Sequence, residues 1–211
     1  LSLGEKLKLK IGDFLVFAPL RDQFGLRRAR WCYTGGAPLG PDTFRFFRAL
    51  GVNLKQLYGS TELAGLCSIQ LDGEANPDTV GKPCGDVQVR IAEKGEVQVK
   101  SSGVFMGYYK NEAATKEAFA EDGWFKTGDA GVIGRDGSLT IIDRAKDVGK
   151  LADGSAFAPQ FVENKLKFSA YISEAISFGH DRPFVTAMVA IDFNTVGKWA
   201  ERRNLPYTNY L

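Results

Sequence analysis

A strand, a helix and a second strand follow one another with very short connections in the first third of this 211-residue chain. Residues 29–34 are rich in β-prone side chains and stop at two glycines, and a Pro-Asp pair then opens a helical pattern at residues 43–50. A glycine closes that helix before the next strand-like run at residues 52–57. A strand–helix–strand unit with tight turns predicts a parallel α/β layer, which we assign to residues 1–80.

The predicted secondary-structure pattern changes twice after this layer. Residues 81–143 contain short alternating strands separated by turn dipeptides, and Asn111 is placed to cap a helix, so a small antiparallel sheet or β-barrel-like subdomain is expected. Residues 144–211 read as helix, strand, strand and helix, which predicts the start of a small α+β domain whose thin core would gain from more chain. The expected fold class is therefore α/β plus α+β.

Composition and charge exclude several functions. The 27 basic and 25 acidic residues leave a formal charge of +2, which provides no strong field for nucleic acid or an anionic membrane. No apolar run reaches the roughly 18 residues that a membrane-spanning helix needs. The chain begins with neither methionine nor the layout of a secretory signal, so we expect it to start inside a longer protein.

Cysteine and histidine usage narrows the chemistry further. Cys32, Cys67 and Cys84 are widely spaced and odd in number, so a disulfide framework or zinc site is not expected and a cytoplasmic location is. Contact of the whole protein with a membrane surface is left open. His180 is the only histidine and is predicted to be an exposed turn residue. Walker-type and Rossmann glycine motifs are absent from the sequence.

A first candidate site follows the strand predicted at residues 52–57. Residues 58–62 read Tyr-Gly-Ser-Thr-Glu, at a strand end where α/β folds place ligands. The ring offers a face for a base to stack on, the hydroxyls can donate to a phosphate, and the carboxylate can bind Mg²⁺. Turns after strands often collect such residues, so an ordinary turn is the alternative.

Two further motifs lie downstream. Asp129 ends a predicted Thr-Gly-Asp turn, where its carboxylate could accept hydrogen bonds from both hydroxyls of a ribose. The alternative is an aspartate that bonds its own backbone in a β-turn. Residues 143–147 read Asp-Arg-Ala-Lys-Asp at the boundary between the expected β-barrel-like subdomain and the α+β domain. This position suits a domain hinge, although such charged runs are often solvated loops.

The order and spacing of these motifs, together with Thr-Gly-Gly-Ala-Pro-Leu at residues 34–39, resemble the AMP-forming adenylate synthetase superfamily. That superfamily includes acyl-CoA synthetases, luciferases and peptide-synthetase adenylation domains. The resemblance extends over essentially the whole chain. Residues 150–165 and 179–184 look most like the long-chain fatty acyl-CoA synthetases.

The resemblance implies roles for individual residues. It places Gly35, Gly36 and Ala37 beside the adenine and the acyl pocket, and it places the Tyr58 ring on the adenine with Gly59 next to it. Thr61 is implied to contact the α-phosphate and Glu62 to hold Mg²⁺.

The same resemblance implies roles for four residues in the later part of the chain. Asp129 and Arg144 correspond to the two ribose contacts, and Lys146 falls on the hinge. Lys150 matches a lysine that relatives use in the second step of the reaction, the transfer to CoA. The resemblance thus implies three catalytic residues, Thr61, Glu62 and Lys150.

The implied reaction joins a fatty acid to CoA through an acyl-adenylate, with ATP converted to AMP and diphosphate. The family's upstream phosphate loop and its C-terminal catalytic lysine have no match in this sequence, so we expect the chain alone not to form acyl-AMP. Other carboxylic acids, such as an aryl acid, a bile acid or luciferin, stay open as substrates. A catalytically dead nucleotide sensor and a purely structural module are the competing classes, and the sequence defines no oligomeric state.

Overall fold

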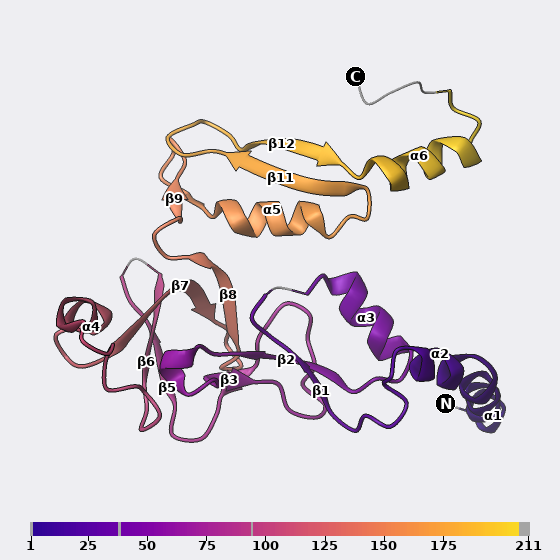
Figure 1. Cartoon of the computed structure of the whole chain (residues 1–211), viewed down its shortest axis with the longest axis horizontal. Coiled ribbons are helices and arrows are strands. Elements are labelled where there is room, and N and C mark those ends of the chain that lie inside the picture. The colour runs from indigo at the N-terminus through magenta and orange to yellow at the C-terminus, as the bar shows by residue number, and fades with distance from the viewer. Residues whose placement is uncertain (1, 38, 94, 207–211) are drawn as a thin grey trace. The chain divides into compact units, whose positions relative to one another are not determined.

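The computed structural model describes residues 2–37, 39–93 and 95–206 (Figure 1). The chain separates into two compact units. The first comprises Leu1–Asp86 with Gly137–Leu139, and the second comprises Val87–Asp136 with Thr140–Leu211. We describe each unit by itself.

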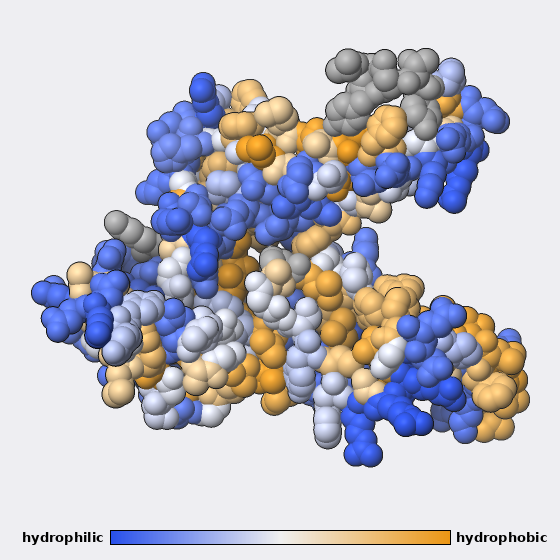
Figure 2. All heavy atoms as spheres, viewed as in Figure 1, coloured by the Kyte–Doolittle hydropathy of each residue, from blue (hydrophilic) through white to orange (hydrophobic). Residues whose placement is uncertain are grey.

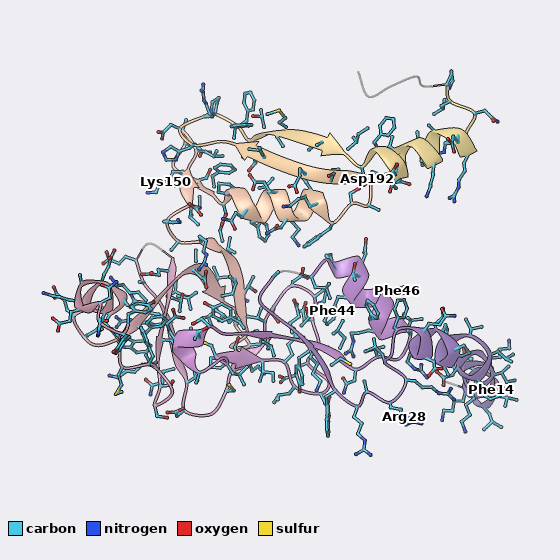
Figure 3. All side chains as sticks on the ribbon, in the orientation of Figure 1. Phe14, Arg28, Phe44, Phe46, Lys150 and Asp192 are labelled. Atoms are coloured by element: carbon cyan, nitrogen blue, oxygen red, sulfur yellow. The ribbon has the colours of Figure 1, made fainter. Side chains whose placement is uncertain are left out.

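The first unit begins with a helical segment that exposes several apolar side chains. Helix α1 (Leu3–Gly12) continues through the π-helical turn η1 (Asp13–Phe17) into α2 (Ala18–Gln23). A capping box starts α1, because Ser2 Oγ accepts from the Glu5 amide at 3.3 Å while the Glu5 carboxylate accepts from the Ser2 amide at 2.7 Å. Figure 2 shows apolar side chains on the surface of this segment, and Figure 3 labels one of them, Phe14, which is 77% exposed.

The predicted parallel layer is present in the first unit. Its sheet has the strand order β1-β2-β3-β4, with α3 (Pro41–Ala49) between β1 (Cys32–Thr34) and β2 (Leu54–Tyr58), followed by β3 (Ser68–Ile69) and β4 (Lys82–Pro83). Strands β1 and β2 are parallel, with Thr34 opposite Gln56, whereas β3 and β4 pair in antiparallel fashion. Phe44, Leu50, Val52 and Leu54 form the buried core beneath α3.

The second unit contains the predicted antiparallel sheet. Its strand order is β5-β6-β7-β8, formed by β5 (Gln88–Ile91), β6 (Glu96–Lys100), β7 (Phe125–Ile133) and β8 (Leu139–Arg144). Helix α4 (Glu112–Ala118) precedes β7. The side chain of Asn111 accepts from the Ala114 amide at 3.1 Å, which confirms the predicted N-cap.

An α+β segment completes the second unit. It consists of β9 (Gly149–Lys150), β10 (Ala156–Phe157), α5 (Pro159–Lys167), the antiparallel pair β11 (Ile172–Phe178) and β12 (Thr186–Ile191), and α6 (Phe193–Arg202). Helix α5 lies along β11 (Figure 1), and Glu163 accepts from the backbone amide of Ser177 at 2.8 Å.

The expected mixture of a parallel α/β layer, an antiparallel sheet and an α+β segment is confirmed. The division into domains at residues 80 and 143 stays a prediction. In the part of the chain that the structure describes, no helix is long and apolar enough to cross a membrane.

Candidate nucleotide-binding site

The loop after β2 folds back tightly on itself. Ser60 O accepts from the amides of Leu63 and Gly65, and Tyr58 O accepts from the Cys67 amide at 2.8 Å. A single 3₁₀ turn, η2 (Thr61–Leu63), forms in between. The backbone therefore holds the predicted base- and phosphate-contacting residues in one compact turn at the end of a parallel strand, where α/β folds bind ligands.

Gly59 is required by this turn because its Cα lies against other backbone. A Cβ atom at this position would overlap the carbonyl group of Gly65. The glycine in the motif is thus explained by close backbone approach, a demand that the turn imposes with or without a ligand.

Replacing Gly59 with alanine is expected to lower the free energy of unfolding by about 1–3 kcal/mol, because backbone rather than a flexible side chain must move. Urea denaturation measures the change. Gly12→Ala is the matched control, since its nearest neighbour outside the helix is 3.9 Å from the added carbon. That control is expected to be neutral or to stabilise by up to about 1 kcal/mol, and equal losses in both variants would contradict the steric account.

The side chains of the loop have the chemistry of a nucleotide site. Tyr58 and Glu62 are half-buried, and Thr61 is exposed. Ser60 Oγ is buried and has no hydrogen-bond partner among the described residues. A buried hydroxyl without a partner is uncommon, so this group has spare bonding capacity at the place where a polar ligand is predicted.

The Gly-Gly turn lies at the same sheet edge. Strand β1 ends at Thr34, opposite Gln56, and Gly35 therefore lies beside Leu57, whose side chain an added Cβ would overlap. Gly36 has a φ of 81°, which favours glycine, and Ala37 is exposed. The structure thus brings Gly35 next to Leu57, the residue that precedes the loop at residues 58–62.

Two buried glutamines support this edge, and the sequence analysis missed them. The Gln56 side chain donates to the carbonyl oxygens of Asn76, Pro77 and Thr79 at 2.9–3.1 Å. Gln70 accepts from the Gln56 amide at 2.9 Å and is fully buried. A polar residue inside each strand-like run was the available signal, because buried amides are normally hydrogen-bonded.

The prediction that Thr127, Gly128 and Asp129 form a turn is wrong. These residues are not a turn between strands but a bulge inside β7, because Lys126 pairs with Gln98 and Ala130 with Glu96. Gly128 has a φ of 73°, which lets the strand accommodate the extra residues. Thr127 Oγ1 donates to Val97 O at 2.8 Å and accepts from the Asp129 amide at 3.1 Å.

The bulge places Asp129 beside Arg144, the last residue of β8. Arg144 Nη1 lies 2.8 Å from Asp129 Oδ1, and the Asp129 side chain is 18% exposed. Ala145 also donates to Gly128 O at 2.8 Å, which holds the two segments together. The two predicted ribose contacts are thus neighbours, 15 residues apart in the sequence.

The predicted hinge begins at a buried carboxylate. Asp143 accepts from the amide of Arg144 at 2.7 Å and from the amide of Gln160, in the first turn of α5, at 2.8 Å. A carboxylate at a helix N-terminus is favoured by the helix dipole. Asp143 therefore connects the end of β8 to α5, and the exposed Lys146 lies in the turn that follows. The sequence analysis gave Asp143 no role of its own.

Lys150 lies on β9, where it pairs with Ala156 and is exposed (Figure 3). Its carbonyl accepts from the Asp181 amide at 2.9 Å, which ties β9 to the turn before β12. His180 is in this turn with its side chain 70% exposed, as predicted.

The described part of the chain does not by itself form a metal site. Within the described residues no group of three or more His, Cys, Asp and Glu side chains could hold an ion. A single carboxylate such as Glu62 still fits Mg²⁺, which commonly uses one or two carboxylates together with phosphate oxygens and water.

The fold is that of an α/β protein with a polar loop and a glycine turn at the carboxyl ends of its parallel strands. Residues 10–109 match the family model described as AMP-binding enzyme.

Long-chain-fatty-acid–CoA ligases are among the relatives that match nearly the whole chain. The enzyme of Mycobacterium bovis is 39% identical over 199 residues, which cover 94% of this chain and 33% of the relative. Long-chain-fatty-acid–CoA ligase 1 of Homo sapiens is 35% identical over 204 residues, covering 90% and 29%. The chain therefore spans about a third of the length of the curated relatives that it matches.

Solved structures share the fold. ATP-bound MatB from Rhodopseudomonas palustris has a TM-score of 0.66 at 30% identity, covering 77% of this chain and 35% of MatB. The anthranilate CoA ligase AuaEII in complex with anthranoyl-AMP has a TM-score of 0.67 at 18% identity, covering 88% and 40%, which shows a common fold alone.

Proposed function

We propose that this chain is the base-, ribose- and metal-contacting part of an AMP-forming long-chain acyl-CoA ligase. The observation that carries the proposal is identity of 39% to a long-chain-fatty-acid–CoA ligase across 94% of the chain. The compact loop at residues 58–62 supports it, because that loop presents an aromatic ring, hydroxyls and a carboxylate at a strand end.

In this proposal the first unit binds the base and phosphate. Tyr58 stacks on the adenine with Gly59 beside it, Thr61 contacts the α-phosphate, and Glu62 is the protein ligand for Mg²⁺. The ion, when bound, neutralises phosphate charge. Residues 35–37 line the adenine and the adjoining acyl pocket.

The later motifs supply the proposed sugar contacts and the proposed hinge. Asp129 and Arg144 bind the ribose hydroxyls. The C-terminal domain expected at residues 144–211 rotates about Lys146 between formation of the acyl-adenylate and formation of the thioester. Lys150 takes part in thioester formation with CoA. Hinge rotation of this kind needs only a few backbone torsions to change.

The proposed chemistry has two steps. A fatty carboxylate attacks the α-phosphorus of ATP and releases pyrophosphate, and the CoA thiol then displaces AMP from the acyl-adenylate. Charge builds on phosphate or carbonyl oxygens in both steps, so positioning and cationic groups supply the catalysis. No covalent enzyme intermediate is required.

The 211-residue chain by itself is expected to bind AMP but to show no ATP–pyrophosphate exchange. The reason is that its sequence contains neither the family's phosphate loop nor its C-terminal catalytic lysine. Exchange with palmitate as the acid is the measurement, and the gene product with its flanking coding sequence is the positive control. Exchange by the chain alone would show that the division of catalytic roles is wrong.

Substrate class is tested with the longer gene product and acids of graded length, from acetate to palmitate, with benzoate and malonate added. Highest kcat/KM on the long-chain acids is the expected outcome. Preference for benzoate or malonate would assign the chain to another acyl-CoA ligase. AMP binding without turnover of any acid would favour a nucleotide sensor, and failure to bind AMP would favour a structural module.

A further inference from the structure

Two of the three cysteines are in contact beside the candidate nucleotide loop. The Cys67 amide donates to Tyr58 O at 2.8 Å, and the Cys67 carbonyl accepts from the Cys84 amide at 3.2 Å and from Cys84 Sγ at 3.4 Å. These residues immediately precede β3 and follow β4, whose register pairs Ser68 with Pro83. Cys67 and Cys84 are therefore the next residues beyond the paired segment, and a backbone hydrogen bond from the Cys84 amide to the Cys67 carbonyl joins them.

If the register continues by one residue, the two cysteines occupy opposite positions on the paired strands. Directly opposite residues point to the same face of a sheet, and their Cα atoms are about 4.5–5.5 Å apart. Disulfides usually span Cα separations of about 4.4–6.8 Å. Both cysteines are free thiols, Cys67 buried and Cys84 partly exposed.

We propose that Cys67 and Cys84 form an oxidation site, a thiol pair that closes into a reversible disulfide next to the Tyr58 loop. The pair was not expected from the sequence, where 16 residues separate the two cysteines without any redox motif. The β3–β4 pairing alone makes them neighbours.

Hydrogen peroxide is the oxidant that the proposal names. The Cys84 sulfur attacks one peroxide oxygen, the O–O bond breaks, and the leaving hydroxide takes up the Cys84 thiol proton, which yields a sulfenic acid and water. The Cys67 sulfur then attacks the Cys84 sulfur and displaces hydroxide, which takes up the proton that the Cys67 thiol loses. Two thiols and one peroxide thus give one disulfide and two water molecules, and a dithiol reductant reverses the change.

The surroundings assign the two cysteines different parts in this sequence. Burial, with a smaller effect from nearby Cys84, raises the pKa of the Cys67 thiol to about 12, so this thiol is protonated at neutral pH. Cys84 is partly exposed and is therefore the sulfur that peroxide reaches first, whereas the buried Cys67 resolves the sulfenic acid.

The disulfide would act on the loop through one hydrogen bond. The Cys67 amide donates to Tyr58 O, the residue that begins the loop. A cross-link at Cys67 limits opening of this strand edge, so amide hydrogen exchange across residues 58–67 is expected to slow by at least about threefold in the oxidised chain. Unchanged exchange in a chain shown to be cross-linked would overturn the coupling.

The cross-link itself is tested by treating the 211-residue chain with hydrogen peroxide, alkylating the remaining thiols and mapping the peptides by mass spectrometry. We expect Cys67 joined to Cys84 and Cys32 alkylated. Cys32→Ser is expected to preserve the link, whereas Cys84→Ala and Cys67→Ala should each abolish it. Cys84→Ala keeps the test valid if the buried Cys67 variant does not fold.

Oxidation in concentrated urea is the control for chance pairing. The loop between Cys67 and Cys84 is about half as long as that between Cys32 and Cys67, which favours the shorter loop by only about threefold in an unfolded chain. In the native chain the ratio of Cys67–Cys84 links to Cys32–Cys67 links is expected to exceed ten. An equal ratio in urea and buffer, or native links to Cys32, would overturn the proposal. None of these measurements involves a nucleotide, so their failure is distinct from failure of the proposed function.

Discussion

Replacing Asp129 with alanine is expected to weaken AMP binding by the 211-residue chain about tenfold to a hundredfold. A hydrogen bond to a charged group contributes about 1.5–3 kcal/mol, and Asp129 is proposed to accept from both ribose hydroxyls. The bulge in β7 already holds this carboxylate in place, so little ordering is needed when ligand binds. Isothermal titration calorimetry with AMP measures the change.

Asp122→Ala is the matched control for this measurement. Asp122 belongs to the same unit and also pairs with an arginine, since its carboxylate lies 2.5 Å from Arg90 Nη1. It lies outside the proposed site and is 54% exposed, so its removal is expected to leave AMP affinity within about twofold. Equal affinities for wild type and the Asp129 variant would remove Asp129 from the nucleotide site.

Replacing Phe44 with alanine is expected to lower the free energy of unfolding of the first unit by about 3–5 kcal/mol. Phe44 is 1% exposed and packs with Leu50, Val52 and Leu54 under α3. The alanine variant loses the transfer energy of a large ring and leaves a cavity that the surrounding residues fill incompletely. Urea unfolding followed by tryptophan fluorescence and circular dichroism gives the midpoint and slope.

Phe46→Ala, on the same helix, separates core packing from helix propensity. Phe46 is 49% exposed (Figure 3) and makes edge contacts with Phe24 and Phe47, at centroid distances of 6.4 and 5.4 Å. Its loss is expected to cost less than about 1.5 kcal/mol, because much of the ring is already in water. Similar losses of unfolding free energy in both variants would show that Phe44 is not a core residue of the first unit.

Most elements of this fold follow from local patterns. A Pro near the start of α3 and Gly51 just beyond its end are helix boundary signals that act within a few residues, and Asn111 caps α4 through its own side chain. Alternating residues likewise define β6 within a single strand. Such features depend on neighbours along the chain, so the sequence suffices to predict them.

Features made by pairing between distant segments were not predicted. Thr-Gly-Asp looks like a turn, and only the register of β7 against β6 shows that the residues form a bulge. The buried Gln56 and Gln70 appear as ordinary polar residues until the loop at residues 76–79 folds over them.

For this protein the sequence alone determined the strand–helix–strand order of residues 29–57, the mixed fold class, the family resemblance and the set of candidate nucleotide contacts, because each depends on local pattern or motif. It did not predict the helical segment at residues 3–23. Tertiary structure decided which residues are neighbours: Gly35 beside Leu57, Asp129 beside Arg144, and Cys67 in contact with Cys84. Strand register joins residues far apart in the chain, and a shift by one residue would turn every side chain to the other face.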